Sequence, residues 1–157
     1  MLKDQRDLLA AFNAHGVKYL VVGAHAVGVH AEPRGTKDLD LLIQADQLNS
    51  EAVFAALAEY GAPLEGVKAA DFNDEPGSVF QIGVPPSRVD ILQKIEAVSF
   101  DEAWANRLPV FIDKDLPTQV ISRDDLIRNK LAVGRPQDLL DVEKIREAAS
   151  VKKSTSS

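Results

Sequence analysis

The chain has 157 residues, a length that fits one domain better than two and that buries a core without a disulfide or a metal. It has no cysteine, which excludes thiol catalysis and disulfide frameworks, and its net charge of −6 disfavours a general role in coating DNA. No apolar run approaches the roughly 20 residues that span a bilayer, so we expect a cytoplasmic protein without membrane contact.

The first half of the chain predicts helices and strands in alternation. In chain order these are a helix over 2–14, a strand over 17–23, a helix over 24–29, a strand over 39–43 and a helix over 47–60. Gly16 and Gly23 are placed to end the first helix and the first strand, and Asp46 is placed to cap the helix that follows it.

The second half predicts more strands and then a pair of helices. The predicted strands cover 79–82, 87–92, 108–112 and 118–121, Ser99 caps a short helix, and the closing helices cover 124–133 and 136–149. We expect a single domain over 1–150, with a core of about 1–121 and a C-terminal helix pair over about 122–149. The polar residues 151–157 predict a disordered tail. The order of elements indicates an α/β fold in which helices pack on a mixed sheet.

Two carboxylates share one face of the second predicted strand. Alternate residues of a strand point the same way, so Asp38 and Asp40 face one side, about 6.6 Å apart along the chain. Such carboxylates repel each other, and a divalent cation such as Mg²⁺, which prefers oxygen ligands, removes the repulsion. Alternatively, Asp38 marks a solvated strand start and Asp40 pairs with Lys37 or Arg34.

A third acid, Asp90, lies in another predicted strand, between Val89 and Ile91. If this strand lies beside the Asp38–Asp40 strand, the spacing of about 4.8 Å between neighbouring strands gathers the three acids into one cluster. The alternative is that Asp90 is solvated or pairs with Arg88.

Several residues near the first two strands could contact phosphate. Gly23 lets the backbone approach a ligand, and the helix that starts at Ala24 offers free N–H groups to an anion. Arg34, Thr36 and Lys37 are candidate contacts to phosphate or to metal-bound water. The alternatives are a glycine needed only for a tight turn, and solvated loop residues.

The order of these features resembles the DNA polymerase β-type nucleotidyltransferases. It consists of a strand ending in Gly23-Ala24, a gap of about a dozen residues, Asp38-Leu39-Asp40, and later the lone strand acid Asp90. The resemblance covers roughly residues 17–92, and Arg34-Gly-Thr-Lys-Asp-Leu-Asp40 is similar to minimal prokaryotic members, including AbiEii-like toxins. The family often has serine or glycine where this chain has Ala24, so a hydroxyl contact to phosphate is absent there.

A C-terminal segment, Lys130 to Asp141, is also similar to this group, in which a helical lysine precedes Arg135-x-x-Asp138-x-x-Asp141. Lys130 lies on the apolar face of its predicted helix, where a lysine is costly unless it meets an anion. The resemblance implies that the anion is a triphosphate. The alternatives are that Lys130 reaches solvent along the helix, and that the aspartates serve the helix N-terminus and pair with Arg135 or Lys144.

The resemblance implies a metal-dependent nucleotidyltransferase with a nucleotidyltransferase-like α/β fold. Mg²⁺ or Mn²⁺ would be bound by Asp38, Asp40 and Asp90, and an NTP would donate its nucleotidyl group and release pyrophosphate. The acceptor is open among a tRNA, a protein and a small molecule. A toxin paired with an antitoxin is one interpretation, and a catalytically degenerate nucleotide-binding or regulatory module of the same fold is the alternative.

Overall fold

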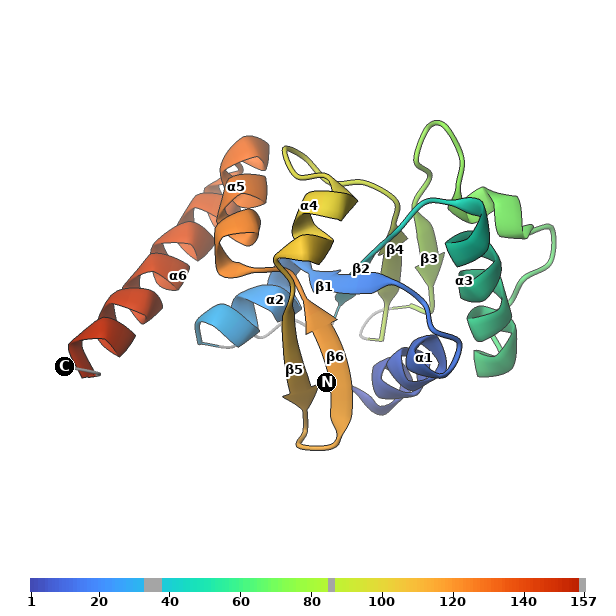
Figure 1. Cartoon of the computed structure of the whole chain (residues 1–157), viewed down its shortest axis with the longest axis horizontal. Helices are drawn as coiled ribbons and strands as arrows, with labels where there is room; N and C mark the ends of the chain where they lie inside the picture. Colours follow the sequence, from blue (N-terminus) through green and yellow to red (C-terminus); the bar gives the residue numbers. More distant parts are fainter. Residues whose placement is uncertain (33–37, 85–86, 156–157) are drawn as a thin grey trace.

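A six-stranded mixed sheet forms the centre of the protein (Figure 1). The computed structural model describes residues 1–32, 38–84 and 87–155, with side chains as far as Val151. The strands are β1 (Tyr19–Val22), β2 (Leu39–Ile43), β3 (Phe80–Ile82), β4 (Val89–Leu92), β5 (Leu108–Ile112) and β6 (Leu116–Val120). They lie in the order β3-β4-β2-β1-β6-β5. The pairs β2–β4 and β1–β6 are parallel, and the pairs β1–β2, β3–β4 and β5–β6 are antiparallel.

Helices pack around this sheet in two groups. They are α1 (Lys3–Ala14), α2 (Gly23–His30), α3 (Gln47–Tyr60), α4 (Phe100–Ala105), α5 (Arg123–Val133) and α6 (Pro136–Thr155), with a short 3₁₀ helix, η1 (Ala69–Phe72). Helix α1 packs on α3, whereas α2 lies on β1 and β2 and contacts α5 and α6. Figure 1 shows α5 and α6 side by side at the left of the view and α3 at the right. The predicted α/β fold with a C-terminal helix pair is confirmed.

Local sequence signals set several helix ends. The side chains of Asp46 and Ser99 accept hydrogen bonds from backbone N–H groups in the first turns of α3 and α4, as predicted. Gly61, with a φ of 95°, ends α3 in the left-handed conformation that glycine adopts at low cost. The sheet is most deeply buried at its centre, where every residue of β1 lies inside the core.

The C-terminal helix is longer than the sequence predicted. Helix α6 continues to Thr155, whereas the prediction ended it near 149 and made 151–157 a disordered tail. The segment after Ala149 contains neither glycine nor proline, so nothing in it stops the helix. The predicted end of the helix is therefore corrected from 149 to Thr155, the disordered tail stays a prediction, and the last two residues lie outside the described ranges.

The described part of the chain has no helix with the length and apolar character needed to cross a membrane.

Candidate functional site

The predicted acids come together at the centre of the sheet. Strand β4 lies beside β2, and their parallel register places Asp90 directly opposite Asp40. Asp38 lies one residue before β2. All three carboxylates line a cleft of about 290 Å³ that α2, α5 and α6 complete. Its lining residues are Gly23, Ala24, Asp38, Asp40, Arg88, Asp90, Lys130, Arg135, Gln137, Asp138 and Asp141.

This cleft contains six of the nine residues that the sequence predicted for the site: Gly23, Ala24, Asp38, Asp40, Asp90 and Lys130. The other three, Arg34, Thr36 and Lys37, lie outside the described residues. Two segments almost 50 residues apart in the chain thus contribute to one acidic cluster because β2 and β4 are neighbours.

Gly23 joins β1 to α2 with its backbone in the left-handed region, at a φ of 67°. A Cβ atom at this position would overlap Asp40 Oδ2 and lie 3.1 Å from Asp40 Cγ. Glycine is therefore needed for two reasons, the turn itself and the close approach of the Asp40 carboxylate to the backbone. The carboxylate in turn is held against the N-terminus of α2.

Gly23→Ala is expected to destabilise the fold and to displace the Asp40 carboxylate. The left-handed backbone alone costs an alanine about 1–2 kcal/mol, and the overlap with Asp40 adds to this. Gly16→Ala is the matched control, because Gly16 has a φ of 65° but an added Cβ meets nothing within 4 Å. Urea unfolding should show a clearly larger loss for Gly23→Ala, and equal losses would contradict the close approach.

One cation is paired with the acid cluster on the strands. Arg88 Nη2 lies 3.4 Å from Asp38 Oδ2, and Arg88 Nε lies 3.4 Å from Asp90 Oδ1. The sequence named Arg88 only as an alternative partner for Asp90, and the structure adds the contact to Asp38. Its position two residues before Asp90 in the predicted strand over 87–92 was the available signal, since alternate strand residues share a face. In the structure it lies one residue before β4.

The cluster still carries uncompensated negative charge. Burial, followed by the nearby carboxylates of Asp90 and Asp38, raises the pKa of Asp40 to about 6, and Arg88 offsets only part of this. The folded protein consequently holds a proton on Asp40 at a pH where the unfolded chain has lost it.

The free energy of unfolding should therefore fall as the pH rises from about 4 to about 6 in the metal-free protein. Between these values the folded state binds the extra proton, and the full effect is on the order of 2–3 kcal/mol. Asp40→Asn removes the titrating group, so urea unfolding across this range in EDTA should show the wild type losing stability relative to Asp40→Asn. A constant difference between the two proteins would contradict the raised pKa.

The carboxylate oxygens of this cluster are suitable ligands for a hard divalent cation. In the structure, however, the three carboxylates do not surround a common point where a cation could bind. Within residues 1–32, 38–84 and 87–155, no three His, Cys, Asp or Glu side chains converge closely enough to hold a metal ion. The Arg88 guanidinium is paired with two of the three acids. Asp90 Oδ1 is buried and accepts no hydrogen bond from the residues that the structure describes, and carboxylate oxygens of this kind are the ligands that Mg²⁺ prefers.

A second, fully buried ion cluster forms the wall of the cleft that α5 and α6 contribute. Lys130 Nζ lies 3.0 Å from Asp141 Oδ2 and 3.3 Å from Asp138 Oδ1, and the Lys130 side chain is only 7% exposed. Lys130 therefore meets its anions within the chain and does not reach solvent. Arg135 Nε donates a hydrogen bond to Asp138 at 2.8 Å, which lowers the pKa of Asp138 to about 2.

Asp138 and Asp141 belong to the family-like segment, and the alternative prediction paired them with Arg135 or Lys144. Asp138 does pair with Arg135. The structure puts both in the cleft beside the strand acids, together with Arg135 and Gln137, whose site positions were not predicted. Gln137 Nε2 donates a hydrogen bond to Asp141 at 2.9 Å. The available signal was the spacing of Asp138 and Asp141, three residues apart on one buried helix face.

Comparison with known structures shows the same fold. The antibiotic-resistance factor ANT(2'')-Ia, in a solution structure, is similar with a TM-score of 0.59 and 16% identity, covering 94% of this chain and 82% of that protein. The lincosamide antibiotic adenylyltransferase LnuA, in its lincomycin-bound crystal structure, has a TM-score of 0.62 and 15% identity, covering 94% of this chain and 98% of its own. No curated protein matches the sequence.

A family match extends over almost the whole chain. Residues 2–152 match the family described as nucleotidyltransferase of unknown function, DUF6036. The match includes both strands that carry the acids and the helix pair that closes the cleft. The chain therefore belongs to the DUF6036 family of nucleotidyltransferases.

Proposed function

We propose that this protein transfers a nucleotidyl group from an NTP to a hydroxyl group of a small molecule, with Mg²⁺ or Mn²⁺ held by Asp38, Asp40 and Asp90. The observation that carries the proposal is the meeting of these three carboxylates at the N-terminus of α2 in one cleft. A bound divalent cation would neutralise charge on the phosphates and activate the acceptor oxygen. The remaining steps use the chain's own residues.

The phosphates would bind where the backbone offers donors. Helix α2 starts at Gly23 without a side-chain cap, so its first N–H groups and the positive end of its dipole are directed to the cleft. Ala24 has no hydroxyl, which leaves backbone N–H groups to make these contacts. Lys130 is paired with Asp138 and Asp141, so it offers the phosphates no net positive charge from the opposite wall. Arg34, Thr36 and Lys37 remain predicted phosphate contacts.

The transfer itself requires the acceptor hydroxyl to lose its proton. The acceptor oxygen forms a bond to the α-phosphorus, the bond from that phosphorus to the bridging oxygen breaks, and pyrophosphate leaves. Asp90 would take the proton; its Oδ1 is buried, lies 3.4 Å from Arg88 Nε and accepts no hydrogen bond from the described residues. Positioning and charge neutralisation would account for most of the rate enhancement.

Two observations favour a small-molecule acceptor over tRNA or protein. One similar structure is named as a lincosamide adenylyltransferase with lincomycin bound, and the other as an antibiotic-resistance factor. The helix pair over 123–147 holds six basic and six acidic residues, so it offers no net positive charge to RNA. The toxin interpretation stays a prediction from the sequence resemblance, and growth arrest on expression, relieved by a neighbouring gene, would test it.

The test is to incubate the protein with each α-labelled NTP, Mg²⁺ and three separate acceptor pools. These are a panel of hydroxylated small molecules that includes lincomycin, total cell RNA, and lysate protein. Label in the small-molecule pool is expected. Label in RNA or protein alone would refute the proposed acceptor class, and a folded protein that labels nothing would favour the alternative of a degenerate nucleotide-binding module.

A further inference from the structure

Arg88 is the only cation among the described residues of the cleft that is paired with the strand acids. The cleft contains five carboxylates and three cationic side chains. Lys130 and Arg135 are engaged by Asp138 and Asp141. Among the described residues, Arg88 is thus the cation ion-paired with Asp38 and Asp90, and Arg135, which is bound to Asp138, acts on Asp40 at longer range. The deficit of positive charge lies at Asp38, Asp40 and Asp90.

The contacts of the Arg88 guanidinium are long. Both ion-pair distances are 3.4 Å, and Arg88 Nε is buried and donates no hydrogen bond to any described residue. The Arg88 side chain is also 34% exposed, so water is available to its outer end. Charge attraction holds the guanidinium in place more than hydrogen-bond geometry does.

The Arg88 backbone is held more firmly. Its carbonyl accepts a hydrogen bond from the Leu39 N–H at 3.0 Å and another from Gln5 Nε2 at 3.4 Å. Gln5 is buried in α1, so the start of β4 is tied both to β2 and to a helix of the core. The guanidinium can therefore leave the acids without a change in the strand that carries Asp90.

We propose that Arg88 is the resident counter-ion of the Asp38–Asp40–Asp90 cluster, and that a divalent cation replaces its guanidinium when it binds. This inference rests on the proposed function, since it concerns the cation that the proposed reaction uses. Arg88 stabilises the metal-free protein by balancing part of the charge of the three acids. It also competes with the cation, so the metal site forms only when both ion pairs of Arg88 break.

This competition has a consequence for the order of binding. When a cation binds alone, the displaced Arg88 guanidinium finds no new anionic partner. A cation that arrives with an NTP brings phosphate oxygens, which a guanidinium binds well. Arg88 thereby makes the site selective for the metal–nucleotide pair over the free cation.

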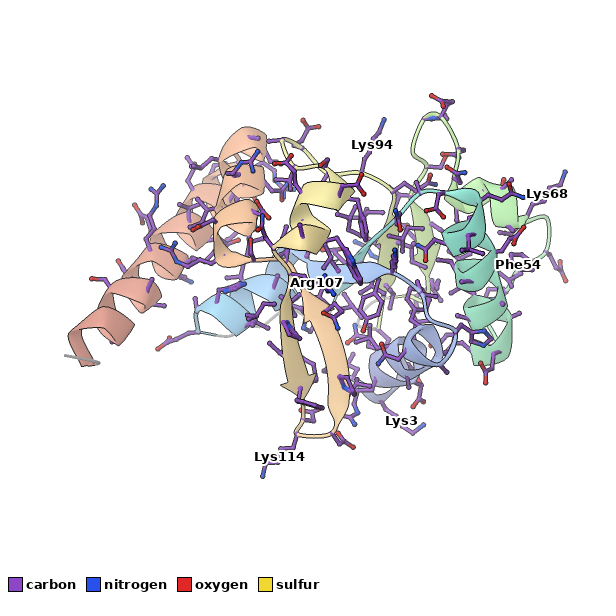
Figure 2. All side chains as sticks on the ribbon, viewed as in Figure 1. Lys3, Phe54, Lys68, Lys94, Arg107 and Lys114 are labelled. Atoms are coloured by element: carbon purple, nitrogen blue, oxygen red, sulfur yellow. The ribbon has the colours of Figure 1, made fainter. Side chains whose placement is uncertain are left out.

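The experiment is a titration with Mn²⁺ in the absence of nucleotide, followed by the electron paramagnetic resonance signal of free Mn²⁺. We compare wild type, Arg88→Gln and Lys114→Gln. Lys114 is the control for lost positive charge, because it lies at the tip of the β5–β6 hairpin, away from α5 and α6 (Figure 2). Arg88→Gln should bind Mn²⁺ about tenfold more tightly than wild type, given the strength of charge interactions near 4 Å at a protein surface.

Melting curves of the same proteins give a second readout. Metal-free Arg88→Gln should melt below wild type, and saturating Mn²⁺ should raise its melting temperature by more than it raises that of wild type. Arg88→Lys keeps the positive charge but loses the planar guanidinium, so its Mn²⁺ affinity should lie between those of wild type and Arg88→Gln. This variant replaces Arg88→Gln in the test if Arg88→Gln does not fold.

Unchanged or weaker Mn²⁺ binding in a folded Arg88 variant would overturn the inference while leaving the metal site in place. Tighter binding in Lys114→Gln to the same degree would overturn it too, because the effect would then come from net charge alone. Absence of Mn²⁺ binding in every variant, and in wild type with NTP, would instead refute the proposed function.

Discussion

Asp40→Asn should lower nucleotidyl transfer by about 1,000-fold or more, because it removes a metal ligand at the centre of the cluster. The fold should survive, and the metal-free protein should become more stable at pH 7–8. Asp40 is the acid of the cluster whose pKa burial raises, so the neutral amide removes a charge that the folded state disfavours. Steady-state transfer of labelled NTP and urea unfolding in EDTA measure the two effects.

Glu143→Gln is the matched control, since Glu143 is exposed on α6 and loses the same charge. It should leave transfer unchanged and stability within about 0.5 kcal/mol of wild type. Retained transfer in Asp40→Asn would contradict the metal assignment. A destabilised Asp40→Asn with no gain at neutral pH would instead assign Asp40 a structural role.

Lys130→Met should cost about 3–5 kcal/mol of stability, because it removes the cation that the buried carboxylates of Asp138 and Asp141 share. Asp141 is fully buried and Asp138 is almost so, and Lys130 contacts both. The sequence resemblance implied a triphosphate as the anion at Lys130, whereas the structure pairs this lysine with two carboxylates of the chain.

The double variant Lys130→Met with Asp141→Asn tests this interpretation. Removing the buried charge of Asp141 as well should recover part of the loss, and the two substitutions should be strongly non-additive in urea unfolding. Lys144→Met, on the exposed face of α6, is the control and should change stability by less than about 0.5 kcal/mol. A loss below about 1 kcal/mol for Lys130→Met would refute the buried ion cluster as a source of stability.

The acid cluster was predictable from the sequence because each of its strands shows a local residue pattern. The alternation of Asp38, Leu39 and Asp40 assigns a face to each side chain, and Asp90 shows the same isolated acid within a strand. That prediction assumed, without evidence from the sequence, that β2 and β4 are neighbours in the sheet. Strand order depends on contacts across some 50 residues, which no local pattern specifies.

On the other side of the cleft, the partners of Lys130 could not be predicted from the sequence around it. An inward lysine predicts an anion, yet the pattern does not distinguish a ligand phosphate from a carboxylate of the next helix. The turn at Gly134, with a φ of 70°, folds α6 back so that Asp138 and Asp141 meet the lysine. The end of α6 was misjudged for a simpler reason, since polar composition alone does not stop a helix.

The most direct test of the account is the melting temperature of the wild type with each NTP, with and without Mg²⁺ or Mn²⁺. Metal and NTP together should raise it more than either alone, because the phosphates complete the coordination shell that the three carboxylates begin. The rise should disappear in Asp40→Asn. Absence of a shift with every NTP and both metals, in a protein shown to be folded, would contradict a metal–nucleotide site in this cleft.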